Sequence, residues 1–231
     1  MYAVGFMKRY DPGVQLARGK IAEAVGSGEL GALRMVDASC FMGDWLENVG
    51  AAISVEEDTR PPAVAARYPE HIGPALHAAY DYFINVFAHN VNLIRYLLPN
   101  EQVACAGGLA HGQTPALNFT SGEVVISLRG TPVAWNAWRE ETRFIFDKGI
   151  IGVRTPSPMN RQATAKVTIA TGHGRVNEER QLHTEVDWCF RRRALGFTAA
   201  VLGREKPLAP GEDCLRDVEI MEDVFRKVKF G

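Results

Sequence analysis

The segment from Asp81 to Leu98 combines a helical period with an unusual placement of polar residues. Four polar positions fall on one face of a helix with 3.6 residues per turn: Asn85, His89, Asn92 and Tyr96. Most other positions are apolar, so the helix is expected to be buried and its polar stripe must find hydrogen-bond partners. Two interpretations stay open. The stripe binds a polyhydroxylated ligand, or it bonds to neighbouring strands within the core.

The N-terminal part of the chain predicts short elements around one well-marked helix. Asp11-Pro12 is typical of a helix N-cap and first helical residue, and the glycines between Gly26 and Gly31 predict the end of that helix. The long irregular stretch 43–72 predicts a binding loop or an excursion at a sheet edge. The regular elements expected in this half are a strand at 2–6, a helix from 12 to about 25, a strand at 32–42 and one long helix from about 74 to 98.

After Glu101 the hydrophobic period changes from 3.6 to 2, which predicts strands joined by tight turns. These strands are expected at residues 103–109, 116–120, 124–128, 134–146, 150–154, 163–171 and 175–183. Helices are expected again at 187–202 and from about residue 210. Because the strands follow one another without intervening helices, the predicted class is α+β, an open, mostly antiparallel sheet with helices packed on one face.

Composition and charge narrow the classes of function. The chain of 231 residues is 46% hydrophobic and 23% charged, with a net charge of −1. It therefore has no basic field for nucleic acid or an anionic membrane. It shows neither a signal peptide nor an apolar run of about 18 residues, which indicates a cytoplasmic protein without a membrane partner. The four scattered cysteines indicate reduced thiols, and no histidine or acidic cluster has the spacing of a metal site.

One glycine motif needs a separate interpretation. Residues 26–31 read GSGELG and match the dinucleotide-binding pattern GxGxxG. They follow a predicted helix and precede a predicted strand, which is the reverse of the order that places a pyrophosphate on a helix N-terminus. We therefore expect a helix stop and a turn here, and no cofactor site in this chain.

Three stretches in a characteristic order carry a resemblance to a known family. They are residues 4–38 (VGFMKRYDPGVQLARGKIAEAVGSGELGALRMVDA), 88–99 (AHNVNLIRYLLP) and 207–227 (PLAPGEDCLRDVEIMEDVFRK). Together they resemble the C-terminal domain of the glucose-fructose oxidoreductase, inositol dehydrogenase and rhizopine-catabolism (Gfo/Idh/MocA) family. The resemblance spans essentially the whole chain and implies a dihydrodipicolinate-reductase-like open sheet, whose uncovered face forms a homodimer interface.

The resemblance implies that residues 1–231 are a substrate-binding and dimerisation domain. The N-terminal Rossmann domain, which carries NAD or NADP in the complete family enzyme, is expected to be absent from this chain. The expected function is the substrate domain of an oxidoreductase that acts on a sugar, inositol or related polyol and cannot transfer hydride by itself. The alternative is a non-catalytic binding or homo-oligomerisation module derived from that family.

The same resemblance implies roles for individual residues. His89 matches the helix histidine that would assist proton transfer beside the substrate carbinol. Asn85 and Asn92 stand where many members have aspartate, and an amide can bind a hydroxyl but cannot act as a base. Arg9 and Tyr10 match a pair that would line the pocket, with a salt bridge and a packed ring as the alternative.

Two further candidates come from the residues alone. Asp44 and Trp45 lie between a predicted strand and the irregular stretch, where they could hydrogen-bond and stack a sugar ring. The alternative is a turn aspartate and a packing tryptophan.

Overall fold

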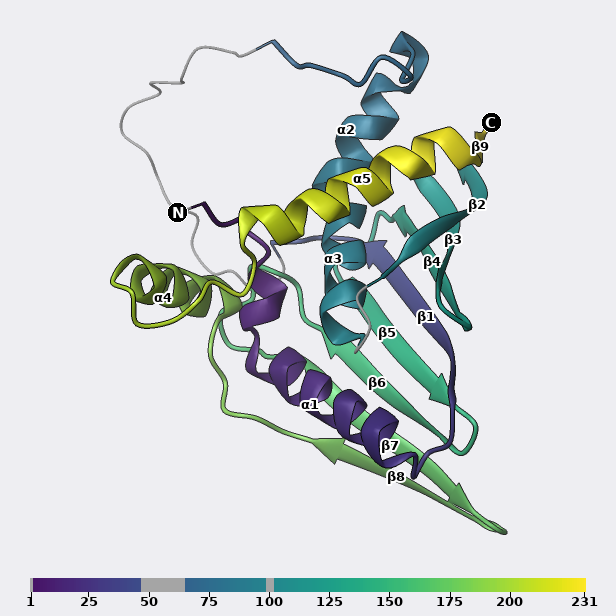
Figure 1. The fold of residues 1–231 in the computed structure, drawn as a ribbon, viewed down its shortest axis with the longest axis vertical. Helices are drawn as coiled ribbons and strands as arrows, with labels where there is room; N and C mark the ends of the chain where they lie inside the picture. The colour runs from purple at the N-terminus through teal and green to yellow at the C-terminus, as the bar shows by residue number, and fades with distance from the viewer. Residues whose placement is uncertain (1, 47–64, 99–101) are drawn as a thin grey trace.

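The computed structural model describes residues 2–46, 65–98 and 102–231 and confirms the α+β class (Figure 1). In this part of the chain one sheet has the strand order β8-β7-β6-β5-β1-β4-β3-β2-β9. Neighbouring strands are antiparallel except for the parallel pairs β1–β4 and β2–β9. The strands are β1 Leu33–Met42, β2 Ala104–His111, β3 Thr114–Ser121, β4 Val124–Pro132, β5 Trp138–Phe146, β6 Gly149–Thr155, β7 Lys166–His173, β8 Val176–Leu182 and β9 Val228–Phe230. The helices are η1 Met7–Tyr10, α1 Pro12–Ser27, η2 Pro74–Leu76, α2 His77–Asn85, α3 Phe87–Leu97, α4 Cys189–Val201 and α5 Gly211–Lys227.

Helix α1 begins and ends where local chemistry predicts. The Asp11 side chain accepts hydrogen bonds from the backbone N–H groups of Gly13 (2.8 Å) and Val14 (3.1 Å), and Pro12 occupies the first turn. At the other end Gly28 adopts a φ of 67°, which a residue with a side chain rarely does. The GSGELG segment is therefore a helix stop and a turn that leads into β1.

The expected strand at residues 2–6 is wrong. Ala3 forms only an isolated bridge to Pro210, and the Val4 N–H donates to the carbonyl of Ala209. This stretch therefore pairs with the segment before α5, and the chain then turns into η1. The irregular stretch predicted at 43–72 lies partly outside the described residues, which leave out 47–64.

The single long helix expected at 74–98 is also wrong, because the helix is broken at Val86 (φ −111°, ψ −64°). Phe83 and Phe87, on either side of the break, contact each other edge-on with 5.1 Å between their ring centroids. Phe83 contacts Phe225 of α5 at 5.4 Å between ring centroids, whereas the Phe87 ring lies over Gly130 of β4, where a Cβ would stand 2.7 Å from it. The polar stripe is therefore divided between α2 and α3.

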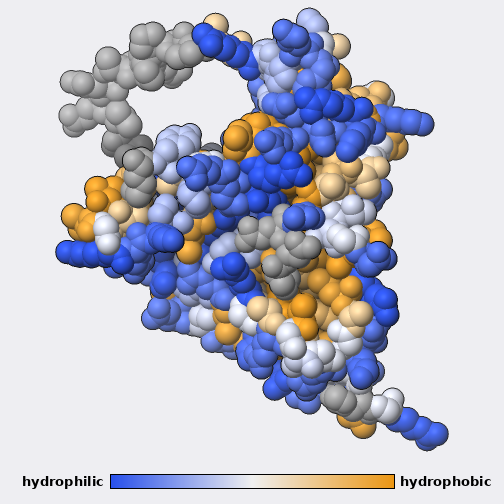
Figure 2. Space-filling view, viewed as in Figure 1, coloured by the Kyte–Doolittle hydropathy of each residue, from blue (hydrophilic) through white to orange (hydrophobic). Residues whose placement is uncertain are grey.

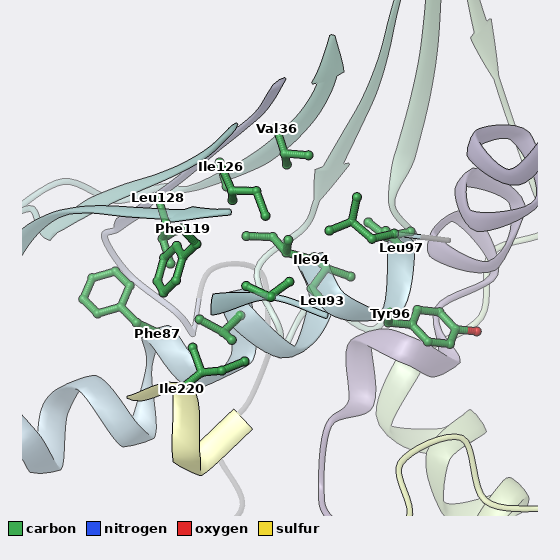
Figure 3. Packing of buried hydrophobic residues seen from close by; sticks show 14 of the residues in the cluster. Val36, Phe87, Leu93, Ile94, Tyr96, Leu97, Phe119, Ile126, Leu128 and Ile220 are labelled. Carbon is green, nitrogen blue, oxygen red and sulfur yellow. The ribbon is translucent and has the colours of Figure 1, made fainter. Parts of the chain in front are cut away.

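The core lies between the sheet and the helices α1, α3 and α5 on one of its faces (Figure 1). Figure 3 shows Val36, Ile126 and Leu128 of the sheet facing Ile94 and Leu93 of α3. The outward side of α5 is mainly hydrophilic in Figure 2, as expected for a helix that buries one stripe of side chains. Among the described residues no helix combines the length and the apolar character that a membrane crossing requires.

The opposite face of the sheet carries a charged cluster. Asp37 of β1 pairs with Arg129 of β4 (3.0 Å) and with Arg143 of β5. The side chains of Val125 and Ile150 are exposed. None of the described helices covers this face in Figure 1. An uncovered face of this mixed character is available for association.

Candidate functional site

A cavity of about 540 Å³ opens where η1, the end of β1 and the α2–α3 break meet the start of β5. Its size lies in the range of small-molecule sites. The residues around it combine aromatic, apolar and a few polar side chains, as binding pockets do. They include Met7, Lys8, Cys40, Met42, Trp45, Tyr82, Asn85, His89, Asn90, Trp138 and Phe190.

A buried carboxylate organises the base of the cavity. Glu140, only 1% exposed, forms an ion pair with Lys8 of η1. The same carboxylate accepts hydrogen bonds from Asn90 Nδ2 (2.7 Å) and from Trp138 Nε1 (3.1 Å). Three elements therefore direct a donor at one carboxylate. Charge-assisted hydrogen bonds of this kind fix their partners in place.

His89 lies at the cavity beside this cluster. Burial and, secondly, the Lys8 ammonium lower the pKa of its imidazole to about 4, and Glu140 opposes these two effects. The ring contacts Phe6 edge-on at 5.1 Å between centroids, and its buried Nδ1 has no hydrogen-bond partner among the described residues. Asn90 Oδ1 is likewise buried and unpartnered. The cavity wall thus contains two buried polar atoms, one on a neutral imidazole and one on an amide, for which the described residues supply no partner.

Three of the predicted site residues come together at the cavity: Asn85, His89 and Trp45. Trp45 is 53% exposed, and its backbone carbonyl accepts a hydrogen bond from Ser157 Oγ (2.7 Å). Asp44 is not among the lining residues. Its carboxylate accepts the Leu46 N–H at 2.9 Å and so closes a turn, which matches the alternative interpretation.

The other predicted residues lie in a buried polar network behind the cavity. Arg9 Nε donates to Asn92 Oδ1 (2.8 Å), and Asn92 Nδ2 donates to Asp217 of α5 (2.6 Å). The Tyr10 hydroxyl accepts the Leu208 N–H at 2.9 Å. Arg9, Tyr10 and Asn92 do not line the cavity. Their contact with a substrate stays a prediction, and the contacts present here join η1, α3 and α5.

Sequence reasoning missed Lys8, Asn90, Trp138 and Glu140. A signal existed for the last of these, because the inward positions of β5 are otherwise apolar or uncharged and end in Phe144 and Phe146. A charged residue in the buried phase of a strand needs a partner. Lys8 gave no such signal, since it lies beside Arg9 in a short 3₁₀ turn whose faces the sequence does not define.

The cysteines and acidic residues add no further chemistry. All four cysteines are free, and burial raises the pKa of the Cys40 thiol at the cavity, so it stays protonated. Within the described parts of the chain, no group of three or more histidine, cysteine or acidic residues could hold a metal ion.

The burial of His89 predicts a dependence of stability on pH. Its folded pKa of about 4 lies below the ordinary value of 6.5, so the unfolded chain binds the proton first as the pH falls. Folding stability carried by the neutral ring is therefore present above pH 6.5 and is lost toward pH 4. We expect the titration of His89 to lower the free energy of unfolding by about 2 kcal/mol between pH 7 and pH 5.

Urea unfolding of the wild type and of His89→Gln across this range measures the effect. The variant should lose less stability than the wild type by that amount, and His111→Gln, at an exposed strand end, should behave as the wild type does. Parallel curves for wild type and His89→Gln would contradict the prediction.

Comparison with known proteins identifies the fold. No protein-family model and no curated protein matches the sequence. Among solved structures, KijD10, a 3-ketoreductase from Actinomadura kijaniata in complex with NADP and TDP-benzene, matches 100% of this chain with a TM-score of 0.67 and 15% identity. The dehydrogenase MviM from Clostridium difficile matches 97% with a TM-score of 0.60 and 14% identity. The chain spans 63% and 61% of their respective lengths, and it has the α+β fold of that part of these oxidoreductases.

Proposed function

We propose that the chain is the substrate-binding and dimerisation domain of a cytoplasmic NAD(P)-dependent oxidoreductase of the Gfo/Idh/MocA type, acting on a sugar, inositol or related polyol. One observation carries the proposal: His89 Nδ1 and Asn90 Oδ1, beside a cavity of about 540 Å³, are buried and find no partner in the described part of the chain. Buried polar atoms of folded proteins are nearly always paired, so an unpaired couple at a cavity favours a hydroxyl-bearing ligand. The fold shared with an NADP-bound 3-ketoreductase supports the same class of reaction.

The GSGELG motif does not fit a dinucleotide. The glycines of GSGELG end α1 and lead into β1, so no helix N-terminus follows them to receive a pyrophosphate. We therefore place the cofactor in a Rossmann domain outside this chain. When bound there, a nicotinamide ring would exchange hydride with the substrate carbon.

The residues of this chain would bind the substrate and handle its proton. As the carbinol is oxidised, the neutral imidazole of His89 accepts the hydroxyl proton, and in the reverse direction it returns that proton to the carbonyl oxygen. The Asn85 amide binds a second hydroxyl, and the Trp45 indole covers one face of the ring. A pKa of about 4 makes the His89 imidazole a weak base, and Glu140 is the nearby group whose charge favours its protonated form.

The uncovered sheet face is the proposed surface for homo-oligomerisation. Asp37 stands between Arg129 and Arg143 there, and Val125 adds an exposed apolar side chain. A second copy of the chain would present the same groups related by a two-fold axis.

The second candidate is a non-catalytic binding or assembly module. The observation that favours it is Asn85, because an amide at this cavity position cannot serve as a base. Such a module would retain ligand binding or self-association without any role in proton transfer.

Ligand binding tests the proposal directly. We expect isothermal titration to detect saturable binding of a neutral polyol, with myo-inositol, D-glucose and D-glucitol as probes. His89→Ala should weaken this binding at least tenfold, since it removes a hydrogen bond at a buried site. His111→Ala, a histidine at the exposed end of β2, should not change it. Binding that is equal in both variants, or absent for all neutral probes, would contradict the assignment of the site.

A further inference from the structure

We infer that Glu140 sets the charge selectivity of the cavity. By pairing with Lys8 it leaves the base of the cavity without net charge, so that the site takes uncharged polyols and excludes carboxylates of the same size. The inference rests on the proposed function, which it narrows to one class of substrate.

Lys8 is the only charged side chain among the described residues that line the cavity. Its ammonium group is buried, with 8% of the residue exposed, and it carries three N–H donors. One donor is directed at Glu140. An unpaired ammonium at this place would be an ideal partner for a carboxylate ligand, as lysines are for anions in many sites.

The Glu140 carboxylate neutralises the Lys8 ammonium and so cancels its attraction for a ligand carboxylate. The carboxylate does not line the cavity, is 1% exposed and is held by Asn90 and Trp138 in addition to Lys8. A ligand therefore meets a neutral ion pair. A ligand carboxylate would approach this buried pair with no cation left to balance it, and an uncompensated buried charge is costly. A hydroxyl group can still accept a hydrogen bond from the ammonium.

The other titratable groups at the cavity do not change this balance. Burial raises the pKa of the Cys40 thiol and of the Tyr82 hydroxyl, so both stay uncharged. The His89 imidazole is neutral at pH 7, since burial and Lys8 both disfavour its protonated form. Asn85 and Asn90 carry no charge. The lining residues and Glu140 together thus have a net charge of zero.

The competing explanation gives the ion pair a structural role only, as a link from η1 to β5. A buried ion pair is a poor source of stability compared with apolar residues of similar volume. The two explanations differ in what they predict for ligand preference. A structural link alone leaves the preference between neutral and acidic ligands unchanged when Glu140 is altered.

The experiment uses pairs of ligands that differ in charge and little in shape. D-glucitol is compared with D-gluconate, and D-glucose with D-glucuronate, by isothermal titration at pH 7 with the wild type and Glu140→Gln. The variant keeps the size of the side chain and leaves Lys8 as an uncompensated cation. We expect its affinity for both acids to rise at least tenfold, while its affinity for the neutral ligands changes less than threefold.

Two further variants separate charge at the cavity from a general charge effect. Glu141→Gln alters the next residue, which points to the opposite face of β5 and pairs with Arg154 at 3.7 Å, and it should bind as the wild type does. Lys8→Met combined with Glu140→Gln removes both charges and should lose the gain for acids. Should Glu140→Gln fail to fold, Glu140→Met leaves the same uncompensated cation and takes its place.

The affinities for acidic ligands test the inference about Glu140, and the affinities of the wild type for neutral ligands test the proposed function. No gain in affinity of the Glu140 variant for gluconate or glucuronate overturns the inference, whatever the neutral ligands do. A gain that the double variant abolishes supports it. A wild type that binds neither glucitol nor glucose contradicts the proposed function, and this arm does not depend on any Glu140 variant.

Discussion

Replacing Arg95 by methionine is expected to lower the free energy of unfolding by about 4 kcal/mol, because it leaves a buried carboxylate without its main partner. Arg95 of α3 is 4% exposed and contacts Asp217 at 2.8 Å and Asp213 at 2.7 Å, both on α5. Asp217 is fully buried, and burial already raises the pKa of its carboxyl against the opposing effect of Arg95. Methionine fills most of the volume but supplies no charge or donor.

Urea unfolding at pH 7 measures this loss, and two variants test its cause. Arg226→Met on α5 removes exposed pairs with Glu222 and Asp223 and should change stability by less than about 0.5 kcal/mol. Adding Asp217→Asn to Arg95→Met removes the stranded charge and should restore part of the loss. A loss in Arg95→Met no larger than in Arg226→Met would show that the network contributes little.

The buried network that includes Arg95, Asn92 and Asp217 also explains why only part of the site could be predicted from the sequence. The helical period places His89 and Asn92 on a common face of the helix. It could not show which other residues contact that face. Asn92 meets Arg9 and Asp217, which lie 83 and 125 residues away in the chain. His89, in contrast, lines the cavity. Periodicity defines a face of a helix, whereas contacts from distant segments decide which part of that face is satisfied and which part stays free.

The fold was predictable where local chemistry decides it. The Asp11 hydrogen bonds to Gly13 and Val14, the stop at Gly28 and the period-2 pattern of the strands after Glu101 can be recognised from neighbouring residues. The break at Val86, the parallel pairing of β1 with β4 and the short strand β9 depend on packing between distant segments. The same limit hid Lys8, whose partner Glu140 is 132 residues away.

Gly13 is a position where a single added methyl group is expected to be strongly destabilising. A Cβ at Gly13 would lie 2.0 Å from the carbonyl oxygen of Ala165, and 2.8 Å from its carbonyl carbon. Both obstacles are backbone atoms, so no side chain can rotate away. The Ala165 N–H also donates to the Asp11 carboxylate at 3.0 Å, which holds the two segments together. Alanine must therefore separate α1 from the start of β7.

We expect Gly13→Ala to lower the free energy of unfolding by about 3 kcal/mol, the upper end of what overpacking usually costs. Gly19→Ala is the matched control, because this glycine is exposed in the same helix with no atom within 4 Å of the added Cβ. It should raise stability by about 0.5–1 kcal/mol, the usual gain from glycine to alanine inside a helix. The opposite signs separate close packing from helix propensity. If both variants were stabilised, α1 would not approach Ala165 this closely, and the placement of the adjoining turn that carries Lys8 into the cavity would lose its support.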